Sequence, residues 1–195
     1  MKRIGLLGGS FDPVHLAHIA LGHAAMQTLA LDEIQLIPAA DPWQRPPLQA
    51  SAEQRLAMLT LASAKEPGIT VNPIEIQRGG PTYTIDTLKA LQKSAHYIWL
   101  LGSDQLANFC TWRNWQEILD YVDLAVAQRP GAPLAIPPEL NRELSAKNQS
   151  LRYIPFSPTD ISASNIRLRL KQAGTTDDCL DPAVMAYIAA HHLYR

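Results

Sequence analysis

Continuous apolar runs alternate along this chain with segments whose apolar residues recur at helical spacing. Continuous runs are typical of strands covered on both faces, and the helical spacing is typical of amphipathic helices. The runs that predict strands span residues 4–7, 32–38, 69–76, 97–101, 121–127 and 152–156. The segments that predict helices begin with one that carries His15 and His18 and continue with residues 51–64, 84–93, 112–119, 161–174 and 182–192. The alternation predicts a Rossmann-like α/β fold, a doubly wound parallel sheet with helices on both faces and a helical C-terminal segment.

Prolines interrupt this pattern. Residues 39–47 are too rich in proline for a helix or a strand and predict a loop. Pro73 predicts a bend or an edge position in the run 69–76. Residues 132–150 contain prolines and are weakly periodic, which predicts a variable surface excursion. Because the chain has 195 residues with no internal repeat and no linker, residues 1–195 are expected to form a single domain.

Short polar residues stand before several predicted helices, where their side chains can accept hydrogen bonds from the first free N–H groups. The expected caps are Ser51 in a capping box with Gln54, Thr82 or Thr84, Ser103 or Asp104, and Ser162, whose helix Gly174 is expected to end.

Charge and cysteine content narrow the class of protein. The net charge is −1, from 17 basic and 18 acidic residues, which argues against a general binder of nucleic acid or of a membrane surface. Cys110 and Cys179 fit no metal spacing and are expected to be free thiols of a reducing compartment. No signal peptide or membrane span is visible, so a cytoplasmic protein is expected.

The segment after the first predicted strand carries the candidate chemistry. Gly8-Gly9-Ser10-Phe11-Asp12-Pro13 has two glycines, which allow a sharp turn and leave backbone N–H groups open to an anion. His15 and His18 stand three apart and can share one helix face, from which they would donate hydrogen bonds or, when protonated, positive charge to a phosphate. A tight turn with two structural histidines is the alternative that this pattern leaves open.

Two further segments can hold parts of a nucleotide. Gly102-Ser103-Asp104 follows a buried strand, where a carboxylate suits ribose hydroxyls, although a helix cap is the alternative. Ser162, Ser164 and Arg167 can form an anion-binding helix end, although an ordinary capped helix with Arg167 and Arg169 in water is the alternative. Ligands of open parallel sheets bind where the strand order reverses, so the first loop and Gly102-Ser103-Asp104 are expected to be neighbours.

The block Gly8–His18 resembles the signature of the nucleotidyltransferases whose helix carries a His-x-Gly-His motif, with Ala17 in place of the glycine. The chain resembles the bacterial nicotinate-nucleotide adenylyltransferase family nearly from end to end. The other segments that carry the resemblance are Tyr83-Thr84, Gly102-Ser103-Asp104, Thr111-Trp112, Arg129-Pro130-Gly131, Ile161–Arg167 and the ending His-Leu-Tyr-Arg. The first loop and the Ile161–Arg167 segment also resemble phosphopantetheine adenylyltransferase.

The resemblance implies a reaction of NAD biosynthesis. The 5′-phosphate of nicotinate mononucleotide would attack the α-phosphorus of ATP directly, giving nicotinate adenine dinucleotide (deamido-NAD) and pyrophosphate without a covalent enzyme intermediate. Alignment and charge stabilisation would supply the catalysis. Mg²⁺ would arrive with ATP, because the sequence offers no carboxylate cage for it. ATP and nicotinate mononucleotide are the expected partners, and both a monomer and a homo-oligomer stay open.

The resemblance also implies roles for particular residues. The implied catalytic residues are His15, His18 and Arg167. The implied ATP-binding residues are Gly8, Gly9, Ser10, Phe11, Gly102, Asp104, Ile161, Ser162 and Ser164. The implied mononucleotide-binding residues are Gln44, Arg45, Thr84, Trp112 and Arg129. Among these, Thr84 would help to hold the nicotinate carboxylate and Trp112 would stack on the pyridine ring.

The chain departs from the family at the proline-rich loop. Gln44 stands where histidine is common and cannot become cationic, which predicts weaker mononucleotide binding or a shifted pH profile. Ala39 and Ala40 stand where asparagine is common. Two other functions therefore stay open. One is an adenylyltransferase for nicotinamide mononucleotide or phosphopantetheine, and the other is a nucleotide sensor that binds without catalysis.

Overall fold

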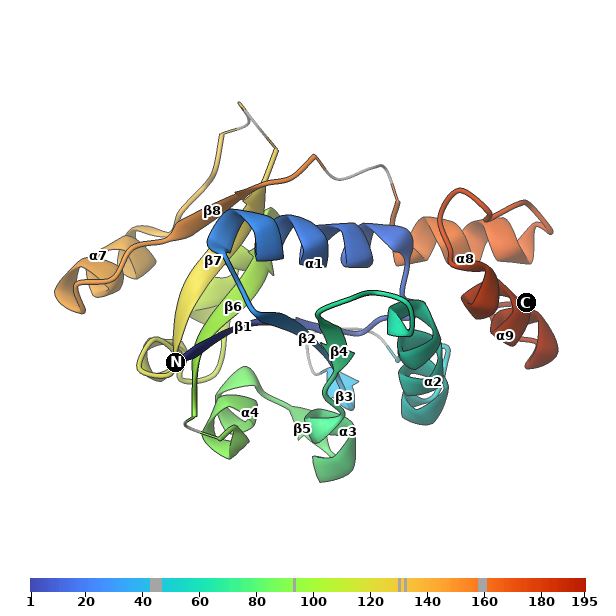
Figure 1. Cartoon of the computed structure of the whole chain (residues 1–195), viewed down its shortest axis with the longest axis horizontal. Coiled ribbons are helices and arrows are strands. Elements are labelled where there is room, and N and C mark those ends of the chain that lie inside the picture. The colour runs from blue at the N-terminus through green and yellow to red at the C-terminus, as the bar shows by residue number, and fades with distance from the viewer. Residues whose placement is uncertain (43–46, 93, 130, 132, 158–160) are drawn as a thin grey trace.

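The computed structural model describes residues 1–195 except 43–46, 93, 130, 132 and 158–160. A six-stranded parallel sheet with the order β4-β2-β1-β6-β7-β8 forms its centre (Figure 1). The strands of this sheet are β1 (Lys2–Gly9), β2 (Glu33–Pro38), β4 (Ile69–Val71), β6 (Ala95–Gly102), β7 (Val122–Gln128) and β8 (Arg152–Pro155). A small second sheet pairs β3 (Asp41–Pro42) with β5 (Pro81–Thr82). The order runs outward in both directions from β1 and β6, so the predicted doubly wound parallel sheet is confirmed.

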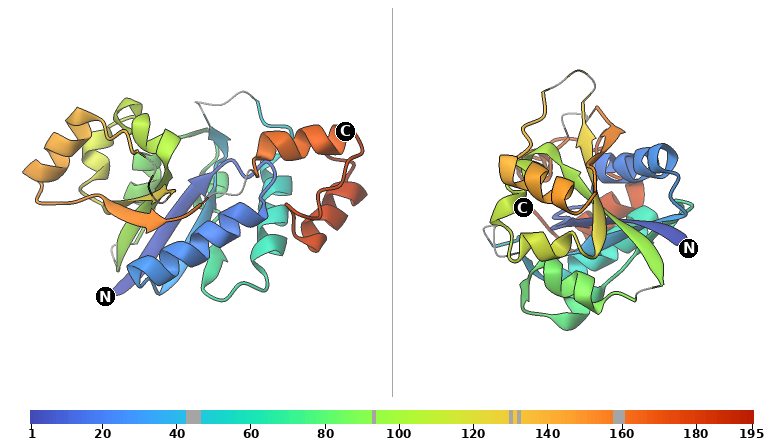
Figure 2. Two further views of the ribbon diagram at one scale, coloured as in Figure 1. Left: turned by 90° about the horizontal axis from the view of Figure 1, so that it is seen from above. Right: turned by 90° about the vertical axis from the view of Figure 1, so that its left-hand side faces the viewer.

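Helices cover both faces of the sheet. One set contains α1 (Leu16–Leu29), α2 (Ala52–Ser63), α8 (Ala163–Lys171) and α9 (Pro182–Ala190). The other contains α3 (Ile74–Arg78), α4 (Thr84–Ala90), α5 (Ser103–Ala107), the 3₁₀ helix η1 (Phe109–Thr111), α6 (Trp115–Ile118) and α7 (Pro138–Ala146). Figures 1 and 2 show α7 at one end of the molecule and the pair α8 and α9 at the other, which confirms the helical C-terminal segment.

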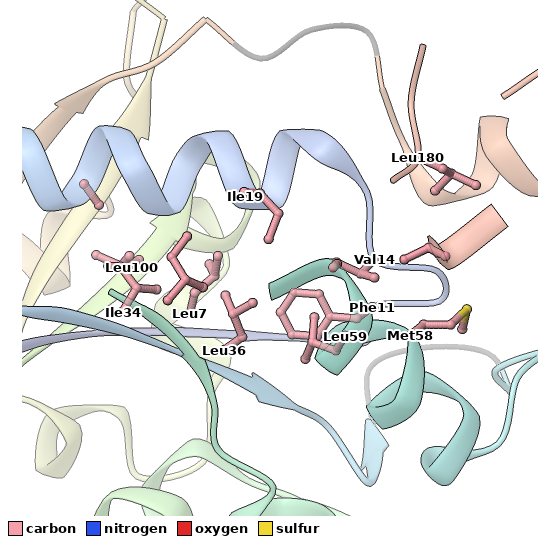
Figure 3. Close-up of a cluster of buried hydrophobic side chains, with 14 of the residues drawn as sticks. Leu7, Phe11, Val14, Ile19, Ile34, Leu36, Met58, Leu59, Leu100 and Leu180 are labelled. Atoms are coloured by element: carbon pink, nitrogen blue, oxygen red, sulfur yellow. The ribbon is translucent and has the colours of Figure 1, made fainter. Parts of the chain in front are cut away.

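Alternation along each strand explains why the apolar runs are continuous. Neighbouring residues point to opposite faces, so Leu6 enters the core beneath α4 to α7 while Leu7 enters the core beneath α1 and α2. Trp99 and Leu100 divide in the same way on β6. Figure 3 shows the second of these cores, with Leu7, Phe11, Ile34 and Leu36 gathered between the sheet, α1 and α2. Both faces are apolar, and an alternating polar pattern is therefore missing from the sequence.

The sequence predicts one strand over residues 69–76, and this prediction is wrong. β4 ends at Val71, and α3 begins at Ile74 directly after Pro73. The Asn72 side-chain oxygen accepts a hydrogen bond from the Ile74 N–H at 3.1 Å, which stabilises the start of the helix. Pro73 thus ends the strand instead of bending it.

Some predicted caps are confirmed and others are wrong. Ser51 and Ser162 cap α2 and α8, as expected. Tyr83 and not a threonine precedes α4, because the Thr82 hydroxyl instead accepts hydrogen bonds from the backbone N–H groups of residues 40 and 41. Gly102 holds the cap position of α5, so Ser103 and Asp104 are its first helical residues.

Two other boundaries differ from expectation. Gly174 is expected to end α8, but the residue with the left-handed backbone is Ala173, with φ 53°. The N–H of Gly174 donates a hydrogen bond to the Arg169 carbonyl at 2.9 Å. Residues 132–150 contain a regular helix, α7, whose Leu140 and Leu144 are buried; a single pair of leucines one turn apart is a weak signal in the sequence. Both cysteines are free, as expected. Of the helices described, none is long and apolar enough to cross a bilayer.

Candidate active site

A cavity of about 600 Å³ lies at the carboxyl ends of β1 and β6, where the strand order reverses. The two strands are direct neighbours, with Leu6 beside Trp99. The predicted site residues that line this cavity are Gly8, Gly9, Ser10, Thr84, Asp104 and Trp112. The first loop and the segment after β6 are therefore neighbours, as expected from the topology. Gly102 itself ends β6 and is not among the lining residues.

The two glycines of the first loop serve close packing and do not make the turn. Both belong to β1, and the residue with the left-handed backbone is Phe11, with φ 48°. A Cβ on Gly8 would lie 2.8 Å from Trp99 Cζ2, and one on Gly9 would lie 3.2 Å from Phe11 Cζ. The predicted glycine turn is wrong, because the glycines admit two large rings. Phe11 is buried in the core, so only its backbone can meet a phosphate.

His15 and His18 lie together, as their spacing predicts. Their ring centroids are 3.7 Å apart in a stacked arrangement. The sequence predicts that His15 belongs to the helix, but His15 is the N-cap of α1. Its backbone N–H donates a hydrogen bond to His18 Nδ1 at 3.2 Å. Because Nδ1 accepts, a neutral His18 carries its proton on Nε2 and keeps that N–H as a donor.

Both histidines are neutral at pH 7 in the ligand-free protein. Burial lowers the pKa of His15 to about 4. Burial and, second, the neighbouring His15 lower the pKa of His18 well below 6.5. Neutral imidazoles can donate hydrogen bonds, but positive charge at this place requires an anion that raises the pKa values again. His15 Nδ1 is buried and has no hydrogen-bond partner among the described residues.

The start of α8 lies beside the first loop. The Ser162 hydroxyl accepts from the Asn165 N–H at 3.2 Å and begins the helix. One turn on, Arg167 Nη1 donates to the Asp12 carbonyl at 2.6 Å, and Nη2 lies 3.4 Å from Ser164 Oγ. Ile161, Ser162 and Ser164 do not belong to the lining of the large cavity. The predicted ATP-binding residues thus divide between the cavity lining, the first loop and the start of α8.

The predicted mononucleotide residues are only partly together. Thr84 and Trp112 line the cavity, and Trp112 packs against Phe109 with ring centroids 5.2 Å apart. Arg129 is exposed and does not line the cavity. Gln44 and Arg45 lie outside the described residues. Arg113, which the sequence interpretation missed, lines the cavity with its guanidinium 4.7 Å from the Tyr83 ring.

Two buried charged residues that the sequence interpretation missed hold the first loop. Arg55 is 1 % exposed and donates to the Ser10 carbonyl at 2.7 Å and to the Ala40 carbonyl at 3.1 Å. Asp12 is 2 % exposed and accepts from the Gln49 N–H at 2.9 Å. A signal for Arg55 exists in the sequence, because it stands one turn before Leu59 on the apolar face of α2.

Glu75 is a buried carboxyl at the cavity wall. Its Oε1 accepts a hydrogen bond of 2.6 Å from the Thr87 hydroxyl, and this bond ties α3 to the first turns of α4. Burial raises the pKa of Glu75 to about 7, although Thr87 and the nearby Arg78 and Arg55 act in the opposite direction. The protonated form is therefore favoured by the fold up to neutral pH.

The Glu75 pKa predicts a pH-dependent stability. The pKa is about 7 in the folded protein against an ordinary 4.5, so the folded protein binds more protons at Glu75 between these values, and the contribution of Glu75 to the free energy of unfolding falls as pH rises through them. The lowered pKa values of His15 and His18 act in the opposite direction, so the effect of Glu75 is measured as the difference in stability between wild type and Glu75→Gln. In urea unfolding this difference should shift against wild type by about 2.5 kcal/mol between pH 5 and pH 8, whereas the difference between wild type and Glu139→Gln, at an exposed position of α7, should stay constant. Equal slopes for wild type and Glu75→Gln would refute the assignment.

The described residues provide no metal cage. No three His, Cys, Asp or Glu side chains among them are grouped to hold an ion. The donors around the first loop are N–H groups and imidazoles, which suit phosphate oxygens better than Mg²⁺. These residues therefore fit a metal that is held by phosphate oxygens, and they do not fit a resident metal ion.

Comparison with known proteins agrees with this geometry. Residues 6–169 match the cytidylyltransferase-like family. The fold matches Plasmodium falciparum nicotinic acid mononucleotide adenylyltransferase complexed with NaAD with a TM-score of 0.77 at 21% identity, covering 100% of this chain and 98% of that one. The sheet, the first loop and the histidine pair thus belong to a member of the cytidylyltransferase-like nucleotidyltransferases.

Closer relatives narrow the family. A probable nicotinate-nucleotide adenylyltransferase of Bordetella petrii is 64% identical over 195 residues, which is 100% of both chains. One of Chromobacterium violaceum is 42% identical over 209 aligned residues, covering 99% of each chain. This chain belongs to the nicotinate-nucleotide adenylyltransferase family.

Proposed function

We propose that this protein transfers the adenylyl group of ATP to nicotinate mononucleotide and thereby makes nicotinate adenine dinucleotide and pyrophosphate. A 5′-phosphate oxygen of the mononucleotide forms a bond to the α-phosphorus, and the bond from that phosphorus to the β-phosphate oxygen breaks. The electron pair leaves with pyrophosphate. The observation that carries the proposal is one cavity at the strand-order reversal, lined by the first loop on one side and by Thr84 and Trp112 on the other.

Alignment and charge stabilisation supply the catalysis. The neutral His18 would donate its Nε2–H to a phosphate oxygen, and the stacked His15 beside it would gain a proton as the anion raises its pKa. Arg167, fixed on the first loop through the Asp12 carbonyl, would add a permanent positive charge for the polyphosphate. Backbone N–H groups of residues 9–11 would complete the phosphate cradle.

The ribose and the acceptor are assigned to the cavity. Asp104 would accept hydrogen bonds from the adenosine ribose hydroxyls, and Trp112 would stack on the pyridine ring. Thr84 would help to hold the nicotinate carboxylate, and Arg113 is the described cation in the lining that can reach the mononucleotide phosphate. Mg²⁺ would enter with ATP on the phosphate oxygens and, when bound, neutralise part of their charge.

The deciding experiment measures pyrophosphate release from ATP and Mg²⁺ with three acceptors in parallel. We expect nicotinate mononucleotide to be used at least about tenfold better, in kcat/KM, than nicotinamide mononucleotide or phosphopantetheine, because Thr84 is assigned to a carboxylate that the other two acceptors lack. Preference for another acceptor would replace the substrate assignment. ATP binding without any release would instead favour a nucleotide sensor.

A further inference from the structure

Asp12 is the centre of a buried junction, and its side chain has no part in the proposed reaction. Its Oδ2 accepts from the Gln49 N–H at 2.9 Å. Its Oδ1 accepts from the Ala50 N–H at 3.1 Å and from the Tyr194 hydroxyl at 2.7 Å. Its backbone carbonyl accepts the 2.6 Å hydrogen bond from Arg167 Nη1. One residue of the first loop therefore joins the segment before α2, the helix α8 and the last residues of the chain.

The hydroxyl of Tyr194 belongs to this junction. It follows α9, is 5 % exposed and packs its ring into the core on the α1 side of the sheet. Burial and, second, the hydrogen bond to Asp12 raise the pKa of its hydroxyl, so the group stays a proton donor. The hydroxyl lies on the Asp12 carboxylate, across 182 positions of sequence. The segment His-Leu-Tyr-Arg, which contributes to the family resemblance, therefore contacts the first loop through Tyr194.

Arg167 lies close to the Asp12 carboxylate without a hydrogen bond to it. The distance from Nη1 to Oδ2 is 4.0 Å, whereas the same nitrogen donates to the Asp12 backbone carbonyl. Three neutral donors already occupy the two carboxylate oxygens. The Arg167 side chain is 24% exposed, so part of its guanidinium remains open to an anion. A carboxylate that lost a donor would attract this guanidinium more strongly.

We propose that Tyr194 is a positioning residue for ATP, whose hydroxyl keeps the Asp12 carboxylate saturated with hydrogen bonds, so that Arg167 serves the polyphosphate instead of hydrogen-bonding to that carboxylate. The inference deepens the proposed function and rests on its assignment of Arg167 to the polyphosphate. Arg55 is the other cation near Asp12 in the described part of the chain, and its guanidinium already donates to two backbone carbonyls. Arg167 is therefore the cation that a partly vacated Asp12 would draw in.

Tyr194→Phe tests the proposal, because it keeps the ring and removes the hydroxyl. We expect the KM for ATP to rise about tenfold and kcat to fall, with the KM for nicotinate mononucleotide changed less than about twofold. The dissociation constant for ATP, measured by calorimetry, should rise in parallel. In an Arg167→Ala background, Tyr194→Phe should change the KM for ATP by less than about twofold, because the residue through which it acts is gone.

Tyr187→Phe is the matched control, since Tyr187 belongs to α9 and its ring lies against His191. It should leave both KM values and the ATP affinity unchanged. A purely structural role for Tyr194 would lower the apparent kcat and the melting temperature while the KM and the affinity for ATP stayed at wild-type values, and that result overturns the proposal. So would an undiminished effect of Tyr194→Phe in the Arg167→Ala background.

The wild-type measurements separate this inference from the proposed function. A wild-type protein that binds ATP but releases no pyrophosphate refutes the reaction, while the ATP affinities of wild type and Tyr194→Phe still decide the role of Tyr194. A wild-type protein that transfers the adenylyl group but whose ATP affinity is indifferent to Tyr194→Phe refutes the inference alone. A wild-type protein that binds no ATP refutes both.

Discussion

His18→Ala should lower the kcat of adenylyl transfer by about 10²- to 10³-fold, the loss typical of a donor aimed at developing charge. The ring provides an Nε2–H for a phosphate oxygen, holds the His15 N–H at 3.2 Å through Nδ1 and stacks on the His15 ring. Alanine removes all three contacts. Pyrophosphate release at saturating ATP and mononucleotide measures the effect, and thermal unfolding shows that the variant is folded.

His23→Ala is the control for this experiment, because His23 belongs to the same helix but pairs with Glu66 away from the first loop. It should keep kcat within about twofold. His18→Gln retains an acceptor and an N–H donor and should recover part of the loss. If His18→Ala kept kcat within about threefold, His18 would be a packing residue and the phosphate would lie elsewhere.

Arg55→Met should reduce the free energy of unfolding by about 3–5 kcal/mol, as expected when one member of a buried charged network is removed. The substitution leaves the carbonyls of Ser10 and Ala40 without their donor and removes positive charge from the neighbourhood of Asp12. For a chain of this size each kcal/mol corresponds to a fall of about 2–4 °C in the melting temperature.

Urea unfolding of Arg55→Met beside Arg142→Met measures this loss. Arg142 is exposed on α7, and its replacement should change stability by less than about 0.5 kcal/mol. A loss below about 1 kcal/mol for Arg55→Met would mean that water or rearranged backbone replaces the guanidinium. The first loop would then not depend on Arg55 for its position.

The sheet and the place of the site follow from local sequence. Strand and helix runs alternate, and in a doubly wound sheet such alternation brings the end of β1 beside the end of β6. The sequence alone therefore predicts that residues such as Gly8 and Asp104 line one cavity. The sequence also predicts the contact between His15 and His18, because a spacing of three residues is a local property of the chain.

Residues whose partners are distant in sequence could not be assigned in this way. Glu75 looks like any polar residue of a strand or a helix, and only the approach of α4 buries it against Thr87. The Thr82 hydroxyl suits a helix cap equally well, but β3 competes for it by bringing two backbone N–H groups within reach. The glycines of the first loop predict a turn from the sequence alone. Their actual role is to leave space for the rings of Trp99 and Phe11, and only tertiary packing brings these rings beside them.

The central position of β1 in the sheet has a consequence for the order in which its neighbours are synthesised. β1 and the first loop are synthesised before β6, the neighbour that completes the cavity and that ends at Gly102. The Tyr194 hydroxyl, which donates to Asp12, comes 182 positions after it. A nascent chain therefore carries the first loop without its full set of hydrogen bonds while these residues are made, and a chain that stops before Tyr194 would lack this donor to Asp12.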